Sequence, residues 1–97
     1  MASASNEGLE RREVHFAGRV QGVGFRYTAR GLAERYGLVG YVQNLPDGRV
    51  LLVAEGPTAN WDRLLATLAE EMDRFIHSTD VQVGPATGEF VQFEIRR

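Results

Sequence analysis

A glycine-rich segment, residues 18–26 (GRVQGVGFR), carries the residue types of this chain that are best suited to hold an anion. Its three glycines within seven residues allow the backbone to turn sharply and to come close to a ligand. The segment leads into a helical pattern, so backbone N–H groups and the positive end of a helix dipole are expected to converge there. Such an arrangement favours a phosphate or a similar anionic group.

Arg26 falls in the first turn of the expected helix, where the helix dipole disfavours a cation by roughly a few tenths of a kcal/mol. An anion bound at this position would compensate for that cost. The alternative is a tightly packed strand-to-helix turn that carries a solvated arginine, and the pattern alone favours neither. The spacing does not fit a P-loop, because no Gly-Lys-Ser/Thr follows. It does not fit a dinucleotide-binding loop, because the next strand is expected to form a hairpin.

Asn44 is the second residue with chemical potential, near the end of a predicted strand and shortly before Pro46-Asp47-Gly48. A side-chain amide donates and accepts hydrogen bonds at once, so Asn44 is suited to position a water molecule. The structural alternative is an Asx-turn, in which the asparagine serves only the neighbouring turn. The residue types leave both interpretations open.

Composition excludes several other chemistries. The absence of cysteine rules out disulfides, thiolate nucleophiles and zinc–thiolate sites. The two histidines, His15 and His77, do not have metal-ligand spacing, so we expect no metal and no cofactor. The net charge of −2 argues against a nucleic-acid partner, and no apolar run approaches the ~20 residues of a membrane span. We therefore expect a cytoplasmic monomer without nucleic-acid or membrane partners.

The chain of 97 residues is long enough for one domain. We expect a flexible tail over residues 1–12 and a folded domain over residues 13–97. The spacing of apolar residues predicts strands over 14–20, 38–45, 49–55, 81–83 and 90–96, and helices over 25–36 and 58–72. Residues 74–79 fit either an extension of the second helix or a loop.

The order βαββαβ, with an extra short strand, is typical of the ferredoxin-like α+β class. In this two-layer sandwich both helices cover one face of a largely antiparallel sheet. Pro46-Asp47-Gly48 predicts a hairpin between the second and third strands. The second helix carries an apolar stripe that predicts its core face: Trp61, Leu64, Leu65, Leu68 and Met72.

Together, the two chemically suited segments resemble the signatures of the acylphosphatase family. Residues 18–26 match the pattern Gly-x-Val-Gln-Gly-Val-x-Phe-Arg at every fixed position. Residues 40–56 (GYVQNLPDGRVLLVAEG) match the second signature, and residues 93–96 are similar to the usual family ending. The resemblance covers about residues 12–97, which is all of the chain except the tail.

The resemblance implies an enzyme that hydrolyses acyl phosphates to a carboxylate and inorganic phosphate by in-line attack of water, without a metal. It implies that Arg26 binds the substrate phosphate and that Asn44 orients the attacking water. The loop expected to bind the same phosphate contains Gln21, Gly22, Val23, Gly24, Phe25 and Arg26. Gly18 and Val20 are expected to shape this loop, and Gln21 to brace it rather than to take part in chemistry.

One stretch departs from the family pattern. Residues 71–80 lack the Gly/Pro-containing linker that often follows the second helix, which bears on acyl-group preference rather than on the phosphate site. The alternative function is a non-catalytic ferredoxin-like module that binds an anion or RNA. An RNA-binding module of this fold would need stacking aromatics on a sheet strand and a basic face. Residues 22–27 (GVGFRY) instead enter a helix in an acidic chain.

Overall fold

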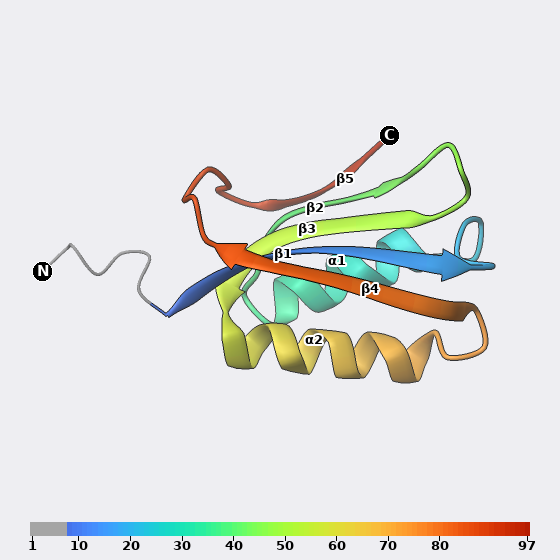
Figure 1. The fold of residues 1–97 in the computed structure, drawn as a ribbon, viewed down its shortest axis with the longest axis horizontal. Helices are drawn as coiled ribbons and strands as arrows, with labels where there is room; N and C mark the ends of the chain where they lie inside the picture. Colours follow the sequence, from blue (N-terminus) through green and yellow to red (C-terminus); the bar gives the residue numbers. More distant parts are fainter. Residues whose placement is uncertain (1–7) are drawn as a thin grey trace, which may run out of the picture.

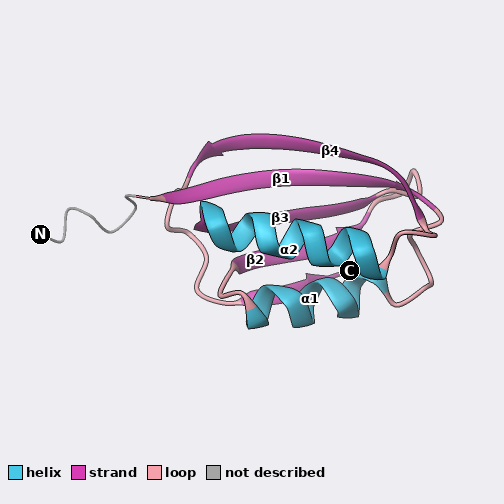
Figure 2. Cartoon of the chain, turned by 90° about the horizontal axis from the view of Figure 1, so that it is seen from below, coloured by secondary structure: helices cyan, strands magenta, loops and turns pink. Residues whose placement is uncertain are grey.

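In the computed structural model, which describes residues 8–97, two helices pack on one face of a five-stranded sheet (Figures 1 and 2). The elements are β1 (Leu9–Gly18), α1 (Phe25–Arg35), β2 (Val39–Asn44), β3 (Val50–Pro57), α2 (Thr58–Glu71), β4 (Ile76–Pro85) and β5 (Phe93–Arg96). The strand order is β4-β1-β3-β2-β5, in which only β5 runs parallel to its neighbour among the described strands. The predicted ferredoxin-like α+β sandwich with an extra short strand is confirmed.

β1 begins at Leu9, before the predicted domain start at residue 13. Residues 1–7 of the predicted tail lie outside the described residues, whereas Leu9–Arg12 pair with β3. Their charged side chains show no apolar alternation, so the pattern does not predict a strand here. Arg12 is nevertheless buried, because its guanidinium contacts Glu10 at 2.6 Å and Asp62 at 3.0 Å.

The last two strands also differ in extent from the prediction. β4 takes in most of the ambiguous stretch 74–79, which is therefore mainly strand rather than helix or loop. β5 begins at Phe93, later than the predicted residue 90. Phe90 instead lies against Tyr41 of β2, with ring centroids 6.0 Å apart. An aromatic residue close to a strand was thus misassigned to the strand itself.

The hydrophobic core lies between the sheet and the two helices, where alternate residues of β1 and β3 meet the helix stripes. The predicted stripe of α2 is buried at Trp61, Leu64, Leu68 and Met72, and Leu65 packs at its margin. Phe16, near the end of β1, and Phe25, the first residue of α1, pack with ring centroids 4.9 Å apart. This contact fixes both ends of the glycine-rich loop that connects the two elements.

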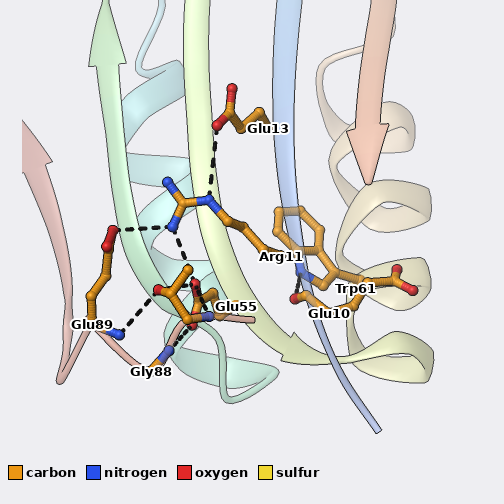
Figure 3. A network of polar contacts seen from close by, with 8 residues as sticks. Glu10, Arg11, Glu13, Glu55, Trp61, Gly88 and Glu89 are labelled. Carbon is orange, nitrogen blue, oxygen red and sulfur yellow. Dashed lines mark hydrogen bonds and ion pairs between the residues drawn. The ribbon is translucent and has the colours of Figure 1, made fainter. Parts of the chain in front are cut away.

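A polar network on the sheet face opposite the helices anchors the connection between β4 and β5 (Figure 3). Glu55 of β3 is only 5% exposed and accepts hydrogen bonds from the Thr87 and Gly88 N–H groups, each over 2.9 Å. The Thr87 hydroxyl and the Arg11 guanidinium also donate to Glu55, over 2.8 and 3.1 Å. The chain is therefore held firmly before it enters β5, which ends beside Arg26.

Candidate active site

The loop between β1 and α1 is shaped by two glycines in the left-handed conformation. Gly22 has φ 77°, and Gly24, the N-cap of α1, has φ 81°. Other residue types are strained in this conformation. The backbone N–H groups from Gln21 to Arg26 have no backbone acceptor within residues 8–97, and the first turn of α1 contains no acidic residue. These N–H groups are available to bind an anion at the positive end of the helix.

Gly18 allows the end of β1 to lie directly against the start of β4. Its φ is 133°, and a Cβ atom there would lie 2.3 Å from the Phe75 carbonyl oxygen and 2.7 Å from the His77 nitrogen. The next residue, Arg19, donates its backbone N–H to Phe75 over 2.9 Å. The loop therefore leaves the sheet at a fixed point that a larger residue would disturb.

Apolar side chains hold the loop against the core. Val20 is fully buried, Phe25 is 2% exposed, and Val23 is partly buried against the core cluster. Burial of such side chains stabilises the folded state by about 1.5–3 kcal/mol each. The loop backbone is thus fixed at both of its ends and by packing against the hydrophobic core.

Gln21 ties the loop to the neighbouring hairpin. Its Nε2 atom donates to the carbonyl oxygens of Leu45 and Arg49, over 2.8 and 3.0 Å. These two carbonyls flank the turn between β2 and β3. Both amide hydrogens therefore have acceptors within the protein, and the side chain holds the loop to the turn between β2 and β3.

The turn between β2 and β3 does not use Asn44. Asp47 accepts a hydrogen bond from the Arg49 N–H over 3.0 Å and contacts the Arg49 guanidinium at 2.8 Å. The Oδ1 atom of Asn44 is buried and has no hydrogen-bond partner among residues 8–97. Leaving such an acceptor unpaired costs about 1–3 kcal/mol, so the Oδ1 atom does not serve the fold through a hydrogen bond. The Asx-turn alternative for Asn44 is therefore wrong.

Arg26 and Asn44 line the same hollow, which has a volume of about 180 Å³. The lining residues are Val20, Gly22, Gly24, Phe25, Arg26, Tyr27 and Asn44. The hollow thus brings together most of the site residues predicted from the sequence, whereas Gly18, Gln21 and Val23 support the loop from outside it.

Tyr27 is a residue of this hollow that the motif analysis missed. Its side chain is 66% exposed, and the Arg30 guanidinium lies 5.4 Å from its ring centroid. The sequence does contain an indication of this position: Tyr27 is an aromatic residue that follows Arg26 directly and does not belong to the apolar stripe of the helix. An exposed aromatic ring at a site entrance offers a surface for an apolar part of a ligand.

The Arg26 guanidinium has no carboxylate partner among the described residues. Its Nη1 atom donates to the carbonyl oxygen of Arg96 over 3.5 Å, which is a long and exposed contact. Gln43 donates to the Arg97 carbonyl oxygen over 3.3 Å, so the end of the chain is held beside the site. The guanidinium keeps most of its donors for a ligand.

Residues 8–97 also show how the chain stands with respect to metal binding and membrane insertion. No group of three or more His, Cys, Asp or Glu side chains lies close enough together to hold a metal ion. Within the same range, no helix has the length and apolar character needed to cross a membrane.

Comparison with known proteins identifies the family. The acylphosphatase family model matches residues 12–95. The chain belongs to the acylphosphatase family. A curated acylphosphatase from Methylococcus capsulatus is 45% identical over 91 residues, which span 92% of this chain and 98% of the relative.

Solved acylphosphatases share the fold as well as the sequence. The crystal structure of acylphosphatase from Bacillus subtilis is 30% identical and superimposes with a TM-score of 0.79, covering 92% of this chain and 99% of that one. An acylphosphatase from Coxiella burnetii, also 30% identical, gives a TM-score of 0.73 over 93% of this chain and 95% of its own. As a member of this family, the chain is an enzyme that hydrolyses acyl phosphates. The family and the activity predicted from the two signatures are therefore confirmed.

Proposed function

We propose that this acylphosphatase binds the phosphoryl group of an acyl phosphate with Arg26 and the loop N–H groups, while Asn44 orients the attacking water. The observation that carries this proposal is that Arg26 and the unpartnered Asn44 amide, which come from α1 and β2, line one hollow. The free N–H groups of the loop between Gln21 and Arg26 complete an anion-binding site beside them.

Binding of the phosphoryl group uses charge and geometry together. A guanidinium presents a planar fork that matches two phosphate oxygens, and backbone N–H groups at a helix N-terminus add fixed donors. Because the loop is already held by Gly18, Val20 and Gln21, these donors need little reorganisation as charge spreads over the phosphoryl oxygens. The long contact of Arg26 with Arg96 is easily exchanged for a phosphate oxygen.

Positioning of water is the role we assign to Asn44. Its side-chain amide, which lines the hollow, hydrogen-bonds to the water, and Asn44 is held at the end of β2, where it pairs with Val50. The water oxygen forms a bond to phosphorus while the bond from phosphorus to the acyl oxygen breaks in line. The products are a carboxylate and inorganic phosphate.

The leaving group explains why such a simple site suffices. A carboxylate with a pKa of about 4 leaves without a strong general acid. Among the described residues, those lining the hollow include no carboxylate and no imidazole. We assign the role of proton acceptor for the attacking water to a phosphate oxygen. We further propose that the enzyme works without a metal, as a cytoplasmic monomer with no nucleic-acid or membrane partner.

The alternative, an RNA-binding module, is not favoured by the open sheet face. Tyr41 lies on that face, but the Arg96 guanidinium stacks over its ring at 3.7 Å and Phe90 contacts its edge. Arg11 on the same face is paired with Glu13 and Glu55, so the face carries no basic excess there. An aromatic ring that is already covered, on a face whose arginines are paired with carboxylates, is a poor stacking platform for bases.

The test is hydrolysis of benzoyl phosphate in the presence of EDTA, with wild type beside Arg26→Ala and Asn44→Ala. We expect wild-type turnover to be unaffected by EDTA, and Arg26→Ala to lose about 10²–10³-fold in kcat/KM while remaining folded. Arg35→Ala, an exposed arginine in the last turn of the same helix, is the matched control and should keep wild-type activity. A folded wild type without turnover would instead support the anion-binding module.

A further inference from the structure

A second hollow lies on the other side of the loop, where the end of β1 meets the connection from α2 to β4. Its volume is about 330 Å³. It is lined by Gly18, Arg19, Arg74, Phe75, Ile76 and His77, none of which lines the first hollow. Three of these side chains carry nitrogen donors, and none carries a carboxylate. The chemistry of this lining therefore favours an anion.

The two arginines of this hollow are not neutralised by acidic side chains. Within residues 8–97, neither Arg19 nor Arg74 forms an ion pair, although the chain as a whole has a net charge of −2. Four other arginines each contact a carboxylate: Arg11, Arg12, Arg49 and Arg96. Two unpaired guanidinium groups at one hollow repel each other. The attraction of each group to an anion bound between them would offset that repulsion.

The backbone around this hollow is rigid on both sides. Gly18 and Arg19 are fixed to Phe75 by close packing and by the 2.9 Å hydrogen bond from the Arg19 N–H. On the other side, the N–H groups of Phe75 and Ile76 both donate to the Met72 carbonyl oxygen, over 2.9 and 3.1 Å. These bonds fix the backbone of the residues that line the hollow, while the donors themselves lie on the exposed side chains of Arg19, Arg74 and His77.

We propose that this hollow is a second anion site, in which Arg19, Arg74 and His77 bind a phosphate or carboxylate group. The guanidinium forks supply charge-assisted hydrogen bonds, and the imidazole adds an N–H donor. Phe75 and Ile76 form the apolar part of the lining. Two sources supply such a group: the distal end of an acyl substrate that carries a second negative charge, or a free anion.

The two histidines of the chain provide a test with an internal control, because His77 lines the hollow and His15 lies in the middle of β1. Inorganic phosphate is titrated into the Arg26→Ala variant at constant ionic strength, and the imidazole C–H resonances are followed by NMR. The Arg26 substitution weakens phosphate binding at the first hollow. We expect a saturable shift of the His77 resonances and none of those of His15.

Removal of either arginine should weaken this titration. We expect Arg19→Ala and Arg74→Ala each to raise the phosphate concentration for half-maximal shift by about fivefold or more, since each removes a charge-assisted hydrogen bond. Arg63→Ala, an exposed arginine near the other end of α2, should leave the titration unchanged. Absence of a His77 shift, or the same titration after both arginines are removed, would overturn the proposal.

Kinetics with Arg26 intact separate the two sources of the anion. If the site takes the distal group of a substrate, Arg74→Ala raises KM for succinyl phosphate and leaves KM for acetyl phosphate unchanged. If it takes a free anion, neither KM changes, while the His77 titration remains. This kinetic comparison rests on the proposed function, whereas the NMR titration does not, so failure of one is distinguishable from failure of the other.

Discussion

The side-chain amide of Gln21 donates to the carbonyl oxygen of Leu45 over 2.8 Å and thereby ties the loop of Arg26 to the hairpin of Asn44. The same nitrogen donates a second hydrogen bond to the carbonyl oxygen of Arg49 over 3.0 Å, on the other side of the turn. One side chain therefore links the group that binds phosphate to the group that orients water. Catalysis depends steeply on such distances, since a displacement of about 1 Å can cost ~10²-fold in rate.

The bracing role predicts that Gln21→Ala impairs catalysis without direct contact with substrate. We expect kcat to fall by about 10–100-fold, because the loop and the hairpin lose their common anchor. Gln21→Glu should be similarly impaired, since a carboxylate cannot donate to two carbonyls. Steady-state kinetics with benzoyl phosphate measure the effect, and circular dichroism checks the fold. A folded Gln21→Ala enzyme with wild-type kcat would contradict the bracing role.

Replacement of Arg26 by lysine tests geometry apart from charge. Lysine keeps the positive charge but loses the planar fork. We expect Arg26→Lys to lower kcat/KM by about 10²-fold and to weaken inhibition by inorganic phosphate less than Arg26→Ala does. Comparison of the inhibition constants of the two variants measures this difference. Equal activity of Arg26→Lys and wild type would show that charge alone suffices.

Asn44→Ala should separate catalysis from stability. If Asn44 orients water, kcat falls while inhibition by inorganic phosphate changes little. The substitution also removes a buried oxygen without a partner, so the free energy of unfolding should stay the same or rise by up to about 1 kcal/mol. Denaturant unfolding and steady-state kinetics on the same preparation measure both. A large loss of stability would show instead that Asn44 serves the fold.

The sequence predicted the elements whose apolar residues repeat regularly. The stripe from Trp61 to Met72 defines the core face of α2, and the helix predicted over 25–36 corresponds to α1. It also predicted the family from two signatures. The catalytic roles of Arg26 and Asn44 remain predictions, although the fold brings both to one hollow.

What the sequence did not predict depends on tertiary pairing. Residues 10–13 of β1 are all charged, and they lie in a strand because they pair with β3, while Arg12 also contacts Trp61 and Asp62 of α2. Asn44 and Asp47 are both able to serve a turn, and the spatial path of the hairpin decides that Asp47 does so. Local patterns do not contain the pairing of β1 with β3 or the contacts of Arg12 with α2, because those partners lie far away in the sequence.

Glu55 predicts a dependence of stability on pH. Its burial raises its pKa, but hydrogen bonds from Thr87, Gly88 and Arg11 lower it by more, so the pKa lies below its ordinary value. The carboxylate therefore stabilises the fold at pH values above the ordinary glutamate pKa of about 4.3. This contribution is lost as the pH falls through the lower pKa of the folded state.

Glu55→Gln should accordingly destabilise the protein at neutral pH by about 1–3 kcal/mol, since hydrogen bonds to a charged acceptor are replaced by weaker ones and an amide group faces buried donors. The difference from wild type should shrink as the pH falls below the ordinary glutamate pKa, because the wild-type carboxyl group then takes up a proton on unfolding and, at still lower pH, in the folded state. Denaturant unfolding at pH 7 and at pH 3 measures both differences. Glu94→Gln, which alters an exposed carboxylate paired with Arg96 at 3.2 Å, is the control and should change little at either pH. A Glu55→Gln effect of equal size at both pH values would mean that shape, rather than charge, holds the chain in place before β5.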